Sequence, residues 1–255
     1  MKKIIFLVLF AEMLLALPSN NPAQPRLAIE GPLISSASFL SLRLGYESSY
    51  SIDDLMESNG RRIDLFEGNA QMGVVTVNFY NRFDVFGLFG KKQSAGAYRF
   101  DDNQVGISFQ SKYRQAWAGG AKVVLFEWGK ASLGFGGRYQ YSSLPLERMV
   151  KNGVPLNVYD ATVEEKAWQL DFGFSYITDL FAPYIQATYR DANKKIGTLL
   201  DVIADDGANI IRMNNQKKYG MAIGTAVTNQ KNFFLNFEAR IIDEQELVIM
   251  GEYRF

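Results

Sequence analysis

The side chains of this sequence that could do chemistry are charged residues set at alternate positions within apolar segments. Each has at least one apolar or aromatic neighbour in sequence, so a strand would turn the charge and that neighbour to opposite faces. The candidates for one polar, inward-facing surface are Arg43, Glu47, Lys122, Arg138, Asp171, Arg190, Glu238, Arg240, Glu252 and Arg254. Rings of such charges select ions in a pore. The alternative is that they pair across strands and fill the interior. Six are basic and four acidic, which predicts at most a slight preference for anions.

Other kinds of chemistry are excluded by composition. The chain has no histidine and no cysteine. It therefore lacks Ser-His-Asp triads, Cys-His pairs, HExxH zinc sites, disulfides and a lipid-modified cysteine. A carboxylate-only mechanism remains open, but we expect no enzyme and no cofactor. The acidic pairs Asp101–Asp102 and Asp205–Asp206 lack the further ligands of a calcium loop, so we read them as solvated turns and expect no metal. Neither the zero net charge nor any motif indicates nucleic acid.

The segments that carry the charges alternate with period two. In residues 168–176 the apolar face is Trp168, Leu170, Phe172, Phe174 and Tyr176, opposite Gln169, Asp171, Gly173 and Ser175. A soluble β-sandwich also shows alternation. The long segments, their aromatic faces and their short turns favour strands of about 9–11 residues that cross a membrane.

The N-terminus predicts export. Lys2 and Lys3 precede a short apolar run, as in a signal peptide, and we place the signal at residues 1–16. A Pro- and Asn-rich segment at 17–38 follows, which we expect in the periplasm, and then the barrel at 39–255. After Leu17 the sequence contains no long apolar run. A membrane domain built without such runs must be a closed barrel, because every backbone polar group in lipid needs a partner.

The predicted fold is an all-β, transmembrane antiparallel barrel of about twelve strands, within a range of ten to fourteen. Ten strands are well marked: about 39–50, 71–80, 84–90, 115–126, 131–142, 166–178, 182–190, 217–228, 232–242 and 246–255. Hairpins across 96–111 and 196–213 would add to them. Short turns, for example at 81–84 and 178–180, alternate with longer loops at 51–69, 91–104, 142–165 and 191–216. Short periplasmic turns and longer outer loops are typical of bacterial barrels.

The last strand ends on an aromatic residue. Phe255 follows Tyr253 at a spacing of two. Bacterial outer-membrane barrels commonly end in this way, and the barrel assembly machinery reads that strand. We predict that Tyr253 and Phe255 form the assembly signal.

Several blocks in order resemble the chlamydial major outer membrane porin family. They are LPSNNPAQPRLAIEG (17–31), LSLRLGY (40–46), NFYNRFDVFGLFG (78–90), VVLFEWGKASLG (123–134), WQLDFGFSYITDLFAPYIQATY (168–189), MAIGTAVTNQKNFFLNFEARIIDE (221–244) and GEYRF (251–255). The resemblance implies a surface-exposed, trimeric general porin. This sequence departs from the family in its reduced loops and in lacking cysteines near Gly87, Trp128 and Lys130, so a disulfide-linked envelope role is not expected.

The sequence therefore predicts a porin in the outer membrane of a Gram-negative cell, through which small hydrophilic solutes and ions diffuse passively. The expected partners are outer-membrane lipid, the assembly machinery and two further copies in a homo-trimer. The rival hypothesis is a structural or adhesive barrel with an occluded lumen, because an inward-folded segment can fill a narrow barrel.

Overall fold

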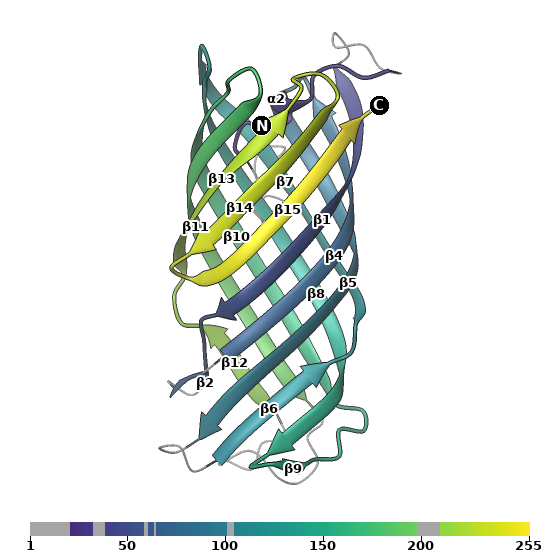
Figure 1. Ribbon diagram of the computed structural model, residues 1–255, viewed down its shortest axis with the longest axis vertical. Helices are drawn as coiled ribbons and strands as arrows, with labels where there is room; N and C mark the ends of the chain where they lie inside the picture. The colour runs from purple at the N-terminus through teal and green to yellow at the C-terminus, as the bar shows by residue number, and fades with distance from the viewer. Residues whose placement is uncertain (1–20, 33–38, 59–60, 64, 101–104, 198–209) are drawn as a thin grey trace, which may run out of the picture.

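A computed structural model describes residues 21–32, 39–58, 61–63, 65–100, 105–197 and 210–255. The strands form one antiparallel sheet rolled into a tall barrel. The described N-terminal segment at 21–32 and the C-terminus lie at the same rim, which we call the rim of the chain ends (Figure 1). The predicted signal peptide and the acidic turns at 101–102 and 205–206 lie outside the described residues. Within the described chain, no helix is long and apolar enough to cross a bilayer.

Ten strands of the described chain close the ring. Each pairs with its neighbour along the sequence, and β15 pairs with β1 in a register that runs from Arg43↔Arg254 to Asp54↔Glu244. The strands are β1 (Leu40–Asp54), β4 (Leu65–Phe79), β5 (Phe83–Phe100), β7 (Arg114–Trp128), β8 (Ala131–Lys151), β10 (Thr162–Tyr176), β11 (Phe181–Gly197), β13 (Tyr219–Thr228), β14 (Phe233–Ile241) and β15 (Glu244–Arg254). Closure gives every spanning strand two partners, which confirms the predicted barrel.

The shorter strands lengthen the wall at the rim far from the chain ends. They are β2 (Met56–Ser58), β3 (Arg61–Arg62), β6 (Val105–Ser111), β9 (Val154–Pro155) and β12 (Ile211–Asn215). Both predicted hairpins pair, with Gly96 opposite Phe109 and Ile196 opposite Ile211. They prolong β5 and β11 without widening the ring, so the count of ring strands is at the lower end of the predicted range.

Much of the chain predicted as long loops is strand. β8 continues to Lys151 and β11 continues to Gly197, both well past the expected ends. The backbone groups of these extensions find partners on neighbouring extensions, which satisfies donors and acceptors that a buried loop would leave unpaired. The hydrophobic interior described below gives the extensions a surface to pack against.

The wall is uneven in height. β13, β14 and β15 have 10, 9 and 11 residues, which is enough to cross a membrane, whereas β8 has 21. The longer strands, among them β5 and β8, therefore reach further toward the lower rim in Figure 1 than β13, β14 and β15 do. The turns at the upper rim are short, as expected for the periplasmic side.

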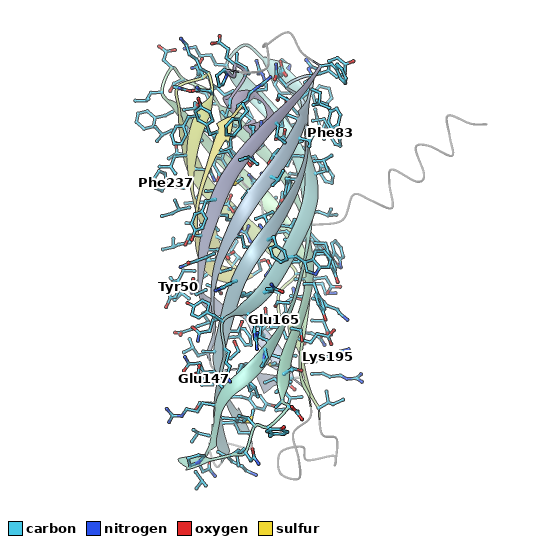
Figure 2. All side chains as sticks on the ribbon, turned by 90° about the vertical axis from the view of Figure 1, so that its right-hand side faces the viewer. Tyr50, Phe83, Glu147, Glu165, Lys195 and Phe237 are labelled. Carbon is cyan, nitrogen blue, oxygen red and sulfur yellow. The ribbon has the colours of Figure 1, made fainter. Side chains whose placement is uncertain are left out.

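The two faces of the wall differ as the sequence predicted. On β1, Leu44 and Tyr46 are exposed, whereas Arg43 and Glu47 are buried on the interior face. Figure 2 shows the same arrangement elsewhere: Phe83 and Phe237 stand out from the wall, and Glu165 lies within it. The exposed apolar side chains form the lipid-facing band of an outer-membrane barrel.

Candidate functional site: the interior of the barrel

All ten charged residues singled out in the sequence lie on the interior face of the barrel. Their side chains are deeply buried, with residue exposures between 0 and 8%. They do not line an open passage in this structure, because they pair with one another, with further charges and with a separate chain segment. Three layers can be distinguished along the barrel axis.

The layer nearest the chain ends is built around Arg43. Its Nε donates to Glu252 Oε2 at 2.6 Å, and its Nη2 contacts Asp84. Thr76 Oγ1 donates to Glu252 Oε1 at 2.7 Å. The guanidinium carbon also lies 5.7 Å from the centroid of the Phe234 ring, whereas its Nη1 has no hydrogen-bond partner among the described residues. Sequence reasoning missed Asp84, which was assigned to a turn, although it follows the outward-facing Phe83 by one residue.

The middle layer joins β10, β11 and β14. Gln169 Nε2 donates to Asp171 Oδ1 at 2.6 Å, and Tyr184 OH donates to Glu238 Oε2 at 2.7 Å. Arg240 Nε lies 2.9 Å from Glu238 Oε1 and its Nη1 lies 3.3 Å from Gln169 Oε1. A charge buried without such partners would carry a desolvation penalty of several kcal/mol, so these pairs are required by burial.

The layer on the outer side is the most highly charged. Arg138 pairs with Glu47 at 2.8 Å, and Arg190 holds both carboxylate oxygens of Asp54, at 2.8 and 3.0 Å. Arg240 also reaches Glu244 at 2.8 Å and Glu246 at 2.9 Å. Sequence reasoning missed several members of this layer. Asp54, Lys92, Glu165, Lys194 and Glu244 lie beyond the predicted strand ends, whereas Glu246 is the first residue of the predicted last strand and was not assigned to the interior. Continuing the alternation past the predicted strand ends would have found Lys194, four residues after Arg190.

This outer layer surrounds a polar cavity of about 60 Å³. Its walls include Glu47, Arg138 and Arg240, whose atoms Glu47 Oε2, Arg138 Nε and Arg240 Nη2 have no hydrogen-bond partner among the described residues. Buried polar groups of this kind bind water or a solute. The cavity can therefore hold a few water molecules between charged walls.

A segment that is not part of the sheet fills the lumen on the side of the chain ends. Residues 21–28 carry the one-turn helix α2 (Gln24–Leu27), which lies inside the upper mouth of the barrel (Figure 1). Ala23, Gln24, Leu27 and Ala28 are at most 1% exposed. Of the predicted periplasmic segment 17–38, this described part thus lies inside the barrel mouth.

We call residues 21–28 the N-terminal plug. Its polar contacts reach around the ring: Lys122 Nζ donates to Gln24 Oε1 at 2.6 Å, and Thr228 Oγ1 donates to the Leu27 carbonyl at 2.6 Å. Arg254 Nη1 donates to the Ala28 carbonyl at 2.7 Å. The predicted interior residues Lys122 and Arg254 therefore hold the plug in place.

The closest fit between plug and wall is at Gly134 of β8. A Cβ atom added there would lie 2.4 Å from the Pro22 carbonyl oxygen and 2.9 Å from Pro22 Cβ, and all three of its nearest atoms belong to Pro22. Gly173, on β10, also faces Pro22. At these two positions the absence of a side chain lets the plug approach the wall closely.

The opposite end of the lumen is closed by the wall's own apolar side chains. This outer apolar cluster comprises Met56, Ile63, Phe66, Tyr98, Ile107, Phe109, Leu144, Leu146, Met149, Ala161, Val163, Ile196, Ile211 and Met213, all buried. Most belong to the strand extensions. The interior therefore changes from charged to hydrophobic toward the outer rim.

The chain is similar along its full length to major outer membrane porins of Chlamydia trachomatis. It is 22% identical to the serovar L1 and serovar B proteins and 23% identical to the serovar A protein, over 96% of each chain. No family model matches. This full-length similarity and the lipid-facing wall agree in placing the protein in the outer membrane as a β-barrel.

Outer-membrane barrels of known structure have lower sequence identity to this chain. The outer membrane protease OmpT from Escherichia coli is 10% identical with a TM-score of 0.41, over 85% of this chain and 96% of the protease. An outer membrane channel from Pseudomonas putida F1 is 11% identical with a TM-score of 0.44, over 86% of this chain and 96% of the channel.

In the part of this chain that the structure describes, no group of three acidic residues is placed to hold a metal ion.

Proposed function

We propose that this protein is a narrow porin for passive diffusion of ions and small hydrophilic solutes, and that its N-terminal plug closes the lumen. The observation that carries the proposal is that residues 21–28 occupy a charged lumen without joining the sheet. A segment outside the hydrogen-bonded ring can leave while the ring stays intact. The serine, threonine, lysine and arginine side chains that it would uncover are suited to hydrated ions.

The contacts of the plug are of a kind that water can replace. Lys122, Thr228 and Arg254 bind it through single hydrogen bonds, each with a modest net contribution of about 0.5–1.5 kcal/mol, or about 1.5–3 kcal/mol where a charged group takes part. Its apolar contacts are mainly with the small residues Ala182 and Ala226 and with Phe234. Release would expose Lys122, Arg43 and Glu252 to solute, and these are the residues for which we propose a pore-lining role at this end.

A second candidate is a structural barrel whose lumen stays occluded. The outer apolar cluster favours it, because hydrophobic side chains such as Phe66 and Leu144 exclude water from the outer end whether or not the plug is bound. Conduction would then require the strand extensions to separate as well.

The remaining parts of the proposal concern assembly. We propose a protein without enzymatic activity that forms homo-trimers and is inserted by the barrel assembly machinery. Tyr253 and Phe255 stack edge to face with ring centroids 5.2 Å apart at the end of β15, where the assembly machinery would read them. Deletion of Phe255 should lower the amount of heat-modifiable barrel in the outer membrane while export continues. An unchanged amount of heat-modifiable barrel would contradict the proposal that Phe255 is part of the assembly signal.

The test of the channel is a comparison of two single-methyl variants in planar bilayers. Gly134→Ala places a methyl group against Pro22 and should raise the frequency of channel openings. Gly87→Ala is the matched control, because an added Cβ there meets nothing within 4 Å. Heat-modifiable mobility on gels verifies that both variants are folded. If neither the folded wild-type protein nor the folded Gly134→Ala variant conducts, the proposal of a porin fails and the structural barrel with an occluded lumen is favoured.

A further inference from the structure

One sector of the outer wall carries an aromatic surface at its outer edge. On β5, β7 and β8 the lipid-facing positions end with Phe89, Trp117, Tyr139 and Tyr141, which we call the aromatic shelf. Phe89 is 60% and Trp117 is 45% exposed, and the two are register partners. The Trp117 ring lies 5.5 Å from that of Tyr139 and 5.9 Å from that of Tyr141. Aromatic rings gather where a membrane meets water, so the shelf marks the level of the outer lipid headgroups.

Basic side chains lie directly above this shelf. Lys91 is the next outward-facing residue after Phe89, Lys112 lies two residues before β7, and Arg114 is the first residue of β7, in register with Lys92. All three side chains are exposed, and none of them forms an ion pair with an acidic residue of the described chain. Lys166, on β10, completes the basic rim: its Nζ lies 5.6 Å from the centroid of the Tyr141 ring and pairs with Glu164 at 2.9 Å.

The strands on one side of this sector carry no charge next to their apolar band. On β1, β4 and β15 the first polar residue of the outward face is the uncharged Ser48, Gln71 or Gln245. On the other side, Lys218 is paired with Asp191 at 3.0 Å, and the exposed Arg212 and Lys217 lie further around the ring. The position of the basic rim beside an exposed aromatic shelf indicates a particular ligand that is both lipidic and anionic.

We propose that the shelf and rim bind a phosphorylated glycolipid of the outer leaflet, of the lipid A type. Phosphate groups would contact Lys91, Lys112 and Arg114, since ammonium and guanidinium groups form charge-assisted hydrogen bonds with phosphate oxygens. The sugar and the upper acyl chains would lie on Phe89 and Trp117, because an aromatic ring offers an apolar face beside a polar boundary. The proposal does not depend on whether the lumen conducts.

The test measures binding of bisphosphorylated lipid A to the purified, folded protein in neutral detergent, by native mass spectrometry. The variant is Lys91→Ala/Lys112→Ala/Arg114→Ala. The control is Arg82→Ala/Lys130→Ala, which removes two exposed basic residues at the rim that carries the chain ends. We expect the triple variant to bind lipid A at least about tenfold more weakly than the wild type, because each basic residue near an anionic surface adds attraction. The control should bind as the wild type does, and added salt should weaken wild-type binding.

Three outcomes would overturn the proposal. One is equal binding by the triple variant and the wild type, with unchanged heat-modifiable mobility. Another is equal loss in the control, which would indicate a nonspecific charge effect. A third is equal wild-type affinity for dephosphorylated lipid A, or displacement of lipid A by inorganic phosphate alone, which would show that phosphate and lipid are not recognised together. A triple variant that lost its heat-modifiable mobility would be replaced by Lys91→Gln/Arg114→Gln, judged by the same outcomes.

Discussion

The two ends of the lumen are closed by different physical means. Toward the chain ends, residues 21–28 lie inside the ring and are bound through separate polar contacts around it, among them hydrogen bonds from Lys122, Thr228 and Arg254. Toward the outer rim, the strands fill the lumen with their own side chains, among them Phe66 and Leu144. The first closure can be undone without breaking a strand pair. The second is a small hydrophobic core, and opening it would expose apolar surface to water.

Between the two closures lies the charged layer, where the largest effect is expected. Arg240 makes contacts of 2.8–2.9 Å with Glu238, Glu244 and Glu246. Arg240→Glu would leave these carboxylates buried beside a further one, and we expect the free energy of unfolding to fall by at least about 3–5 kcal/mol. Denaturant unfolding in detergent measures it. Arg82→Glu, at a side chain that is 59% exposed, should change stability by no more than about 1 kcal/mol.

Ion selectivity provides a second readout of Arg240→Glu. Because its contacts tie Arg240 to three carboxylates, the substitution should lower stability more than it changes the reversal potential. A variant of wild-type stability with a clear shift toward cations would mean that Arg240 faces an open passage, and the three-layer description of the lumen would fail.

The next effect compares matched leucines at the two closures. Leu144 is 0% exposed in the outer apolar cluster, and Leu27 is 1% exposed in the plug. Leu144→Ala should cost about 2–5 kcal/mol of barrel stability. Leu27→Ala should lower the stability of the barrel by a smaller amount, and it should increase the frequency of channel openings. Equal losses of stability, measured by the same unfolding assay, would show that the plug is an integral part of the barrel core.

The smallest effect depends on pH. Asp243 lies in the turn between β14 and β15, and burial, followed by the neighbouring Glu244, raises its pKa to about 7. The folded state therefore holds this proton more tightly than the unfolded chain does. Its contribution to folding is complete below the ordinary aspartate pKa of 3.8 and is lost progressively as pH rises from there to about 7. Asp243→Asn should therefore raise the unfolding midpoint most at about pH 8 and leave it nearly unchanged only below about pH 4. Asp179→Asn, in an exposed turn, is the control.

The sequence predicted the ring well because a strand that faces lipid on one side and polar groups on the other has to alternate. That constraint identified the ten ring strands and the interior side of residues such as Arg43 and Glu238. The alternation is required only for the part of a strand that lies in the membrane. The strand extensions outside the membrane were therefore predicted as loops, and the interior residues Asp54 and Lys194 within them were missed.

The partners of the interior charges could not be predicted from the pattern. Arg138 pairs with Glu47 across the lumen, 91 residues away in sequence, and such pairs depend on the stagger of the strands around the ring. The N-terminal plug was missed for another reason: residues 17–32 have no periodicity, and their place inside the barrel follows from single contacts such as Pro22 against Gly134.

The most direct test of the central claim is the reactivity of one cysteine placed in the plug. The chain has no other cysteine, so Ala23→Cys gives a single thiol at a site that is 0% exposed. The rate of its modification by a small thiol reagent is compared with that of Lys231→Cys in an exposed turn. Our account predicts slow modification of position 23, faster modification when Gly134→Ala is added, and no change at position 231. Modification of position 23 as fast as position 231 in the otherwise unchanged protein would contradict a plug held inside the lumen.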